Sequence, residues 1–483
     1  MSTDPEIGRA TKLASTIARD IEAEIVRRGW PVGESLGSER ALQERFSVSR
    51  SVLREAVRLV EHHQVARMRR GPGGGLLVCE PDAGPATRAV VIYLEHLGTT
   101  LGDLLNARLL LEPLAASLAA ERIDEAGIDR LRAVVREQEQ WRPGMPMPRD
   151  EFHIALAQQS KNPVLQLFID VLIRLTTRYA LQSQTGSASE AVEALDHMHL
   201  HHSELVDAVT AGDAARAKTL SERHVEAVTA WLQQHRRGHG GRSRKPRRRL
   251  DVEAPRGKLA EMLAATIGEE IGAGGHRVGS VFGTETALLE RYRVSRAVLR
   301  EAVRLLEYHS VAQMRRGPGG GLVVTEPHAQ ASIDTIALYL QYRQPNREDL
   351  RCVRDAIEID NVAKVVKRRT ESDVVAFLET HLPALGDSPT PADVRKATTE
   401  EFRFHVGLAQ LAGNALLDLF LRIIVELFRR HWSSTGQALP SWNDVVAVEH
   451  AHLRIVEAIA AGDDSLARYR VRRHLDAAAS WWL

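Results

Sequence analysis

The sequence predicts a mainly α protein built from two similar halves, each joining a small helical domain with a β-hairpin to a larger all-helical bundle. Three observations lead to this fold class. The stretch VSRSVLREAVRLVEHHQVARMRRGPGGG at 48–75 returns, with few changes, as VSRAVLREAVRLLEYHSVAQMRRGPGGG at 294–321. Apolar residues recur at spacings of three and four along most of the remaining chain, as in VLQLFIDVLIRLTTRYAL at 164–181, which is typical of helices packed on a core. Each copy of the repeated stretch ends in a Gly-rich turn between two short strand-like segments, which predicts a hairpin.

Length and composition place limits on the protein. A chain of 483 residues is too long for one ordinary core, so two to four domains are expected. The formal net charge is only +1, so a nucleic-acid binder would have to concentrate its positive charge locally. No apolar run reaches the roughly 18 residues that span a bilayer, and the first residues lack a signal-peptide core. We therefore expect no contact with a membrane. The sequence has only two cysteines, Cys79 and Cys352, which cannot make a disulfide framework, so we expect a cytoplasmic protein.

The repeat extends over a whole multidomain unit. FHIALAQQSKNPVLQLF at 152–168 returns as FHVGLAQLAGNALLDLF at 404–420, and the segment 202–224 returns at 452–474. We therefore predict small hairpin-containing domains at 8–80 and 256–326, helical bundles at 86–234 and 330–483, and a basic linker at 235–255. The linker composition, rich in Gly, Pro, Ser and Arg, favours a solvated tether; nonspecific contact with phosphates is the alternative.

In the first small domain, two short helices with a tight turn between them are expected. Ser38 can cap a helix that runs through Phe46, and Ser49 can cap a second helix that ends near His62. On the second helix one face is apolar and should join the core, namely Leu53, Ala56, Val57 and Val60.

The polar face of that second helix is typical of a DNA reader. Arg50, Ser51, Arg54 and Arg58 are free to meet a partner, and arginine suits guanine edges and phosphates. In a helix-turn-helix the start of the second helix enters the major groove. The following hairpin carries Arg67, Arg69 and Arg70 before its glycines, so the domain is predicted to be a winged helix-turn-helix.

These motifs resemble the GntR family of bacterial transcription regulators. The pattern is carried by Gly33, Leu36, Ser38, Glu39, Arg40, Val48, Ser49, Arg50, Leu53, Arg54, Glu55 and Ala56, and in the second copy by Gly279, Thr284, Glu285, Val294, Ser295, Arg296, Leu299, Arg300, Glu301 and Ala302. The second copy departs at Thr286, where the first keeps Arg40; relatives use that arginine on DNA, so the resemblance implies weaker or different reading by the second head. The expected DNA contacts are Arg40, Ser49, Arg50, Ser51, Arg54, Arg69, Arg70 and Gly73, with Ser295, Arg296, Arg300, Arg315, Arg316 and Gly319 in the second copy.

The helical bundles contain histidines in a suggestive pattern. Glu401 and His405 share a helix face, and His452 and His474 follow on later helices. A carboxylate and imidazoles converging from several helices form a transition-metal site, for which Zn, Ni, Fe or Mn is suited. Spacing alone is weak evidence, because helical histidines are commonly surface or core residues.

The bundles also resemble the FadR-type ligand domain, FCD, of GntR regulators, and the resemblance strengthens the metal prediction. Its metal-binding members use an Asp four residues before the first histidine; Glu401 stands there in the second half. In the first half His153, His202 and His224 match, but Arg149 occupies the carboxylate position and Asp150 lies one step round the helix, about 100° away, so a metal is expected chiefly in the second half. Further histidines, His197, His199, His201 and His450, are interpreted as solvated or as neighbours of the site. Arg108 and Arg354 match an arginine that in relatives holds a carboxylate ligand; an ion pair with Glu112 or Glu358 four residues later is the alternative.

The resemblance implies a bacterial, nucleoid-associated regulator, in this family most often a repressor, that binds double-stranded operator DNA and responds to a small carboxylate effector. No motif supplies a general base or nucleophile, so no catalytic residue is predicted and an enzyme is not expected. A metal-dependent enzyme and an architectural DNA-binding protein without effector are the alternatives. Relatives dimerise to read two half-sites, so the fused halves are expected to form an intramolecular pseudo-dimer, with a further homodimer left open. We expect the operator to be recognised mainly by the first head, and the effector or metal to be bound mainly by the second bundle.

Overall fold

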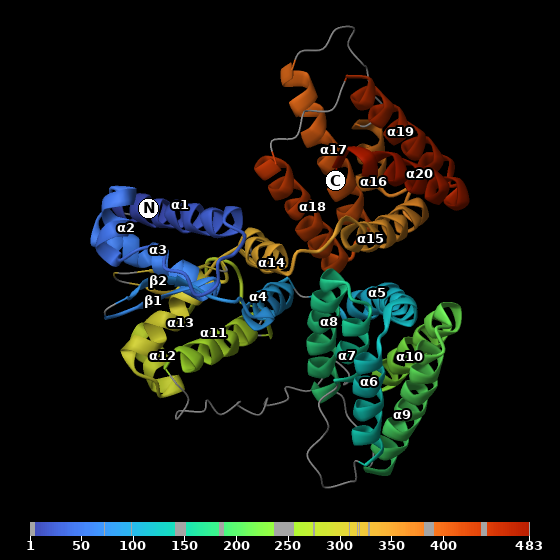
Figure 1. Cartoon of the computed structure of the whole chain (residues 1–483), viewed down its shortest axis with the longest axis horizontal. Helices are drawn as coiled ribbons and strands as arrows, with labels where there is room; N and C mark the ends of the chain where they lie inside the picture. Colours follow the sequence, from blue (N-terminus) through green and yellow to red (C-terminus); the bar gives the residue numbers. More distant parts are fainter. Residues whose placement is uncertain are drawn as a thin grey trace. The chain divides into compact units, whose positions relative to one another are not determined.

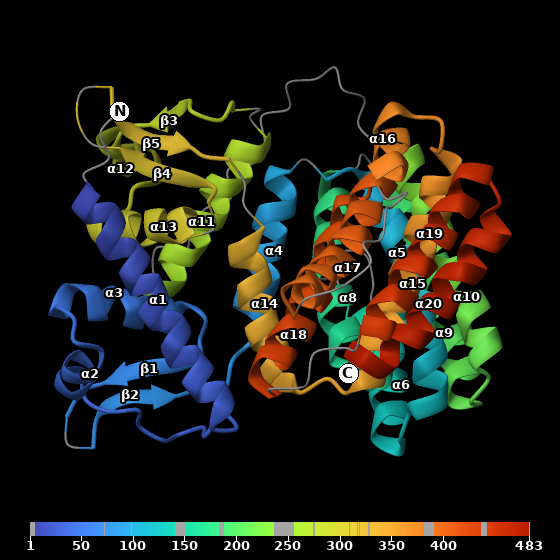
Figure 2. The same cartoon turned by 90° about the horizontal axis from the view of Figure 1, so that it is seen from above.

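The computed structural model describes residues 5–71, 73–97, 99–140, 151–182, 188–235, 256–273, 276–308, 310–315, 317, 319–326, 329–380, 391–435 and 442–482. Arg149, Asp150, Arg316 and all of the predicted linker except His235 lie outside these residues. The chain divides into two compact units, one of Met1–Val90 with Gln330–Gln344, the other of Val91–Ala329 with Pro345–Leu483. Helices dominate both units, and the strands are few and short (Figures 1 and 2), which confirms the predicted mainly α class.

The first unit contains the first head, a three-helix domain with a hairpin. Its elements are α1 (Pro5–Arg27), α2 (Glu39–Phe46), α3 (Arg50–His62), β1 (Ala66–Arg69) and β2 (Gly75–Val78). The long helix α1 packs along α3, and its Ile17, Ile21 and Ile25 are buried with the predicted α3 face in one core. The strands pair antiparallel, with Ala66 opposite Val78 and Arg69 opposite Gly75. The hairpin therefore folds as predicted, directly after the second helix of the helix-turn-helix.

A helix from the other half of the sequence completes this core. Helix α14 (Gln330–Arg343) packs on α1 and places Leu338 among the buried residues of the first head. Nearby, the rings of Trp30 and Tyr342 lie 5.2 Å apart, and the Tyr342 hydroxyl hydrogen-bonds Glu80. The head is thus assembled from two segments that are far apart in the chain.

The second unit contains a second head with the same plan. Its elements are α11 (Arg256–Ala273), β3 (Val281–Gly283), α12 (Glu285–Tyr292), α13 (Arg296–Tyr308), β4 (Ala312–Arg315) and β5 (Gly321–Val324). The three strands form one antiparallel sheet in the order β3-β5-β4, seen side by side in Figure 2. Helices α11 and α13 pack together over a core that matches the first head at most positions, as expected for a duplicated sequence, although among the described residues it contains no counterpart of Trp30 or Leu338.

Apart from α4 (Ala83–His96), the other helices that the structure describes belong to two helical bundles. After α4, the first bundle comprises α5 (Leu101–Arg122), α6 (Glu125–Glu139), α7 (Phe152–Gln159), α8 (Pro163–Gln182), α9 (Ala188–Thr210) and α10 (Ala214–Gln234). The second comprises α15 (Arg347–Lys367), α16 (Ser372–Thr380), α17 (Pro391–Ala412), α18 (Ala415–Thr435), α19 (Trp442–Ala461) and α20 (Asp464–Trp482). Helices α5 and α15 both begin with capping boxes, formed by Thr100 with Asp103 and by Asn346 with Asp349. None of the helices in the described part of the chain is long and apolar enough to cross a membrane.

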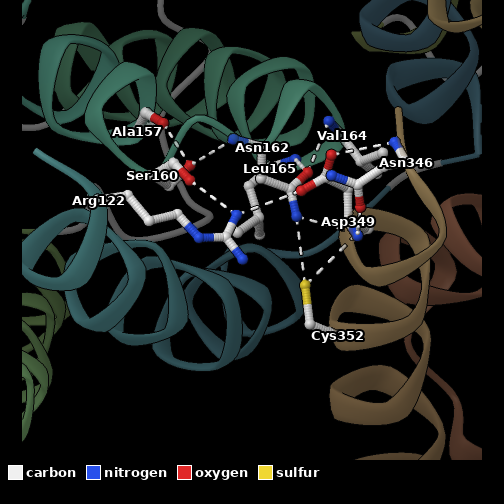
Figure 3. A network of polar contacts seen from close by, with 9 residues as sticks. All are labelled: Arg122, Ala157, Ser160, Asn162, Val164, Leu165, Asn346, Asp349 and Cys352. Carbon is white, nitrogen blue, oxygen red and sulfur yellow. Dashed lines mark hydrogen bonds and ion pairs between the residues drawn. The ribbon is translucent and has the colours of Figure 1, made fainter. Parts of the chain in front are cut away.

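The two bundles contact each other through equivalent surfaces. Asn162 caps α8 with its side-chain oxygen and donates from Nδ2 to the backbone carbonyl of Asp349 at 2.9 Å (Figure 3). Its counterpart Asn414 caps α18 in the same way and donates to the carbonyl of Asp103 at 3.0 Å. Reciprocal contacts of this kind are the mark of a two-fold interface, here within one chain.

That interface also contains a pair of equivalent aromatic residues. Phe168 and Phe420 occupy the same position in the two copies, and their rings stack 3.9 Å apart with planes 7° from parallel. One polar contact breaks the symmetry. Arg122 donates both to the Ser160 carbonyl and to the Asp349 carboxylate (Figure 3), whereas its counterpart Arg368 pairs with Glu371 and Asp373 in its own bundle.

Candidate nucleic-acid interface and metal centres

The helix-turn-helix of the first head is built by local capping. The Ser38 hydroxyl accepts from the Ala41 amide and the Ser49 hydroxyl from the Val52 amide, so each side chain closes the start of its helix. Between the helices Ser47 adopts a left-handed conformation with φ of 52°, which turns the chain sharply. The predicted caps, turn and core face are all present.

The arginines at the start of α3 are exposed and share one carboxylate. Glu39 accepts from Arg50 Nε at 3.1 Å and from Arg54 Nε at 2.7 Å. Hydrogen bonds from Arg50 and Arg54 lower the pKa of Glu39, and the bond to Glu39 raises the pKa of Arg50. Glu39 therefore orients two predicted DNA contacts, a role that sequence reasoning missed. The only signal was a carboxylate next to a cap residue.

The other predicted contacts of this head also lie at the surface. Ser49, Ser51, Arg40, Arg69, Arg70 and Gly73 are exposed. Arg40 pairs with Glu44 on α2. A Cβ on Gly75 would lie 2.6 Å from the Gly37 carbonyl oxygen, so this glycine is required by packing inside the head. Gly73, with φ of 71°, has open space around it at the tip of the hairpin.

The second head presents a comparable surface with weaker internal pairing. The Ser295 hydroxyl accepts from the Val298 amide and caps α13, and Thr284 caps α12. Arg296, Arg300, Arg315 and Gly319 are exposed. Arg296 lies 3.8 Å from Glu285, the counterpart of Glu39.

In the second bundle the four predicted ligands converge. Glu401 and His405 lie on α17, His452 on α19 and His474 on α20, all buried, with their donor atoms within 4.8 Å of one another. His452 Nε2 is 2.8 Å from Glu401 Oε2, and His405 Nε2 is 3.0 Å from His474 Nε2. Two imidazole nitrogens facing each other at this distance need a proton or a cation between them. This donor set fits a transition metal.

A buried ion pair contacts the far nitrogen of one of these imidazoles. Glu358 on α15 contacts His405 Nδ1 and accepts from Arg354 Nε at 2.5 Å. Burial opposes the charge on Glu358, but Arg354 and His405 outweigh burial and lower its pKa to about 2. Burial likewise opposes the charge on His405, and Glu358 and Glu401 outweigh it and raise its pKa to about 9. Holding Nδ1 in this way directs Nε2 toward the centre, as in known metal sites.

His452 has the opposite shift. Burial lowers its pKa to about 4 against the attraction of Glu401, so its imidazole is neutral and available as a ligand at neutral pH.

In the first bundle three predicted histidines converge. His153 on α7, His202 on α9 and His224 on α10 are buried, and Nε2 of His153 lies 3.3 Å from Nε2 of His224. Burial and the neighbouring imidazoles hold the pKa of His202 and of His224 well below the usual value. Gln138 accepts from His202 Nδ1 at 2.8 Å, and the buried Nε2 of His202 has no hydrogen-bond partner. A metal ion would satisfy that lone pair, so this centre also fits a cation.

The first centre has an equivalent buried ion pair. Glu112 contacts His153 Nδ1 at 2.8 Å and pairs with Arg108, which also donates to Thr176. Arg108 and Arg354 are thus both in the ion pairs that the sequence offered as an alternative, but these pairs are buried. Their contact with an effector stays a prediction. His199 and His201 lie beside the centre, with ring contacts to His202 and His224.

Comparison with known proteins agrees with this arrangement. The FCD domain profile matches twice, at residues 103–227 and 349–477, which together make up more than half of the chain. The profile described as bacterial regulatory proteins, gntR family, matches residues 13–75, the first head.

Individual relatives match about half of this chain. It is 28% identical to the HTH-type transcriptional regulator LutR of Bacillus subtilis, over 41% of this chain and 90% of the relative. It is also 28% identical to the Uxu operon regulator of Haemophilus influenzae, over 46% of this chain and 81% of the relative. Among solved structures, a GntR protein of Streptococcus agalactiae aligns over 45% of this chain and 99% of its own, at 22% identity and a TM-score of 0.30. Less than half of this chain thus covers most of the length of each of the two named regulators.

Proposed function

The chain belongs to the GntR family of bacterial regulatory proteins, with the FCD domain present twice, and on that premise we propose that it is a DNA-binding transcription regulator that acts as a repressor. Its two winged heads read the two halves of one operator. A small organic acid bound in the helical bundles alters the affinity for that operator.

The observation that carries the proposal is the pair of capped helices α3 and α13, each opening with exposed arginines. Arg50 and Arg54 on α3 correspond to Arg296 and Arg300 on α13. Arginines at the start of the second helix of a helix-turn-helix are placed for base edges and phosphates in the major groove. Because both heads belong to one chain, binding of one raises the effective concentration of the other at a neighbouring half-site.

The bundles supply the sensing part of the proposal. When bound, a divalent metal such as Zn, Ni, Fe or Mn would offer open coordination positions to the carboxylate of an effector. Glu401, His405, His452 and His474 would hold it in the second bundle, and His153, His202 and His224 in the first. Glu358 and Glu112 orient one imidazole in each centre. An effector changes operator affinity only if it binds the two arrangements of the heads unequally.

A metal-dependent enzyme is the rival function for such centres. The named relatives are regulators, and two DNA-reading heads have no role in a small-molecule enzyme. The regulator is therefore the function that explains both parts of each half.

The test is a gel shift with DNA from the region upstream of the protein's own gene. Arg50→Ala with Arg54→Ala should weaken specific binding by at least ~30-fold, because two base or phosphate contacts at about 1–3 kcal/mol each are lost. Arg468→Ala, which removes an exposed arginine on α20, is the matched control and should bind normally. Unchanged affinity of the double variant, with a native circular dichroism spectrum, would refute the DNA-reading assignment.

A further inference from the structure

The two metal centres of this chain differ in one donor. In the second bundle the carboxylate of Glu401 lies within contact distance of the imidazoles of His452 and His474, at 2.8 and 3.4 Å. In the first bundle the corresponding group of described residues consists of His153, His202 and His224, all imidazoles. The residue at the sequence position of Glu401 is Arg149, which lies outside the described residues.

The carboxylate that orients one imidazole is matched in the two centres. Glu112 supports His153 as Glu358 supports His405, and each of these carboxylates pairs with an arginine four residues earlier on the same helix. In each bundle the positive charge of the arginine offsets the negative charge of the supporting glutamate. Among the described residues, the second centre therefore has one more carboxylate than the first, and that carboxylate is Glu401, one of the grouped donors.

The first centre is also richer in imidazole around its edge. His201 contacts the ring of His224 at a centroid distance of 5.8 Å, and His199 approaches His202 at 6.5 Å. The repeat aligns His201 with Ala451 and His199 with Glu449. Nitrogen donors thus dominate the first centre, whereas the second contains both nitrogen and oxygen donors.

We propose that the two bundles hold different metal ions. The first centre binds ions that favour imidazole, Zn²⁺ or Ni²⁺, and discriminates against Mn²⁺, whereas the second accepts Mn²⁺ as well. The reason is that Mn²⁺ stands lowest in affinity for nitrogen donors and is bound well when carboxylate oxygen joins the set. This inference rests on the metal-binding part of the proposed function and assigns a separate selectivity to each half.

The experiment counts metal on the full-length protein after removal of metal with a chelator. Zn²⁺ measured by elemental analysis should reach two per chain, and Mn²⁺ measured by electron paramagnetic resonance should reach one. Glu401→Ala turns the second centre into a three-histidine site, so it should keep two Zn²⁺ and lose Mn²⁺. His153→Ala should lower Zn²⁺ to one and leave Mn²⁺ at one, and His405→Ala should remove Mn²⁺ and one Zn²⁺.

Two Mn²⁺ bound per native chain, or Mn²⁺ retained by Glu401→Ala, would overturn the proposal, and so would the absence of any bound metal. Thermal melts of each variant show that it is folded. The gel shift of the same samples is a separate readout, so a failure of metal selectivity is distinguishable from a failure of DNA binding.

Discussion

Glu39 shows how one carboxylate organises the surface that we propose meets DNA. It ties Arg50 and Arg54 together through side-chain hydrogen bonds at an exposed site. Exposed ion pairs contribute little to stability, so the value of Glu39 lies in the position of the guanidinium groups and in the negative charge it adds to the surface. That charge repels phosphates and opposes indiscriminate binding.

Glu39→Gln should therefore raise affinity for nonspecific DNA several-fold and lower the ratio of specific to nonspecific affinity. Fluorescence anisotropy with operator and random duplexes, at several salt concentrations, measures both quantities. Glu285→Gln in the second head is the matched control and should have a smaller effect, because Glu285 lies 3.8 Å from Arg296. Equal effects of the two substitutions would contradict this role of Glu39.

Arg354 is the second residue whose role depends on burial. It is 5% exposed and lies against two buried carboxylates, Glu358 and Glu401. An i,i+4 ion pair at a helix surface contributes a few tenths of a kcal/mol, but removing one partner of a buried pair leaves an uncompensated charge.

Arg354→Met should lower the free energy of unfolding of the metal-free protein by about 3–5 kcal/mol. Urea denaturation followed by circular dichroism measures it. Arg422→Met, which breaks a partly exposed pair with Asp418 on α18, should cost less than about 1 kcal/mol. A loss for Arg354→Met as small as the one expected for Arg422→Met would show that Arg354 is not structurally important.

At the scale of elements, helix α14 belongs to the first head although it follows the second head in sequence. Leu338 lies in the core formed by α1 and α3, and Tyr342 contacts both Trp30 and Glu80. Sequence reasoning placed 330–343 at the start of the second ligand domain. An apolar helix face shows that a partner exists, but periodicity does not identify the partner.

Leu338→Ala should destabilise the first head by about 2–5 kcal/mol through loss of buried area and a residual cavity. Hydrogen exchange read by mass spectrometry should show lower protection in α1 and α3 and unchanged protection in α11 and α13. Val375→Ala, at an exposed position of α16, is the control. If protection fell in the second head instead, the assignment of α14 would be wrong.

At the scale of the whole molecule, the duplication places a two-fold interface inside one chain. Asn162 and Asn414 make the same reciprocal contacts, and Phe168 stacks on its own counterpart Phe420. Covalent linkage allows the two sides to diverge, as the ion pair between Arg122 and Asp349 shows. In a symmetric homodimer a single substitution would appear on both sides.

Cleavage at a protease site inserted within 240–250 should leave the two halves associated, because the contacts between bundles and the packing of α14 on the first head do not involve that segment. Size-exclusion chromatography after cleavage should give one peak that contains both fragments. Phe168→Glu with Phe420→Glu places two like charges in the interface and should weaken the association. Separation of the unsubstituted fragments would contradict the covalent pseudo-dimer.

The sequence by itself determined the local features of this protein. Repeats revealed two copies, and Ser38 and Ser49 marked helix starts that the structure confirms, because capping acts over three or four residues. Histidine spacing, aided by family resemblance, also predicted the two groups of side chains that the structure brings together; that they bind a metal stays a prediction.

Only the tertiary structure decided which distant segments meet. The support of His405 by Glu358, the packing of Leu338 in the first head and the reciprocal contacts of Asn162 and Asn414 all join residues far apart in sequence. The burial that turns Arg354 from a surface ion pair into a structural one is also a property of the packed bundle. Such contacts depend on how apolar helix faces choose among several possible partners, and that choice is made by the packing of the whole core rather than by any local pattern.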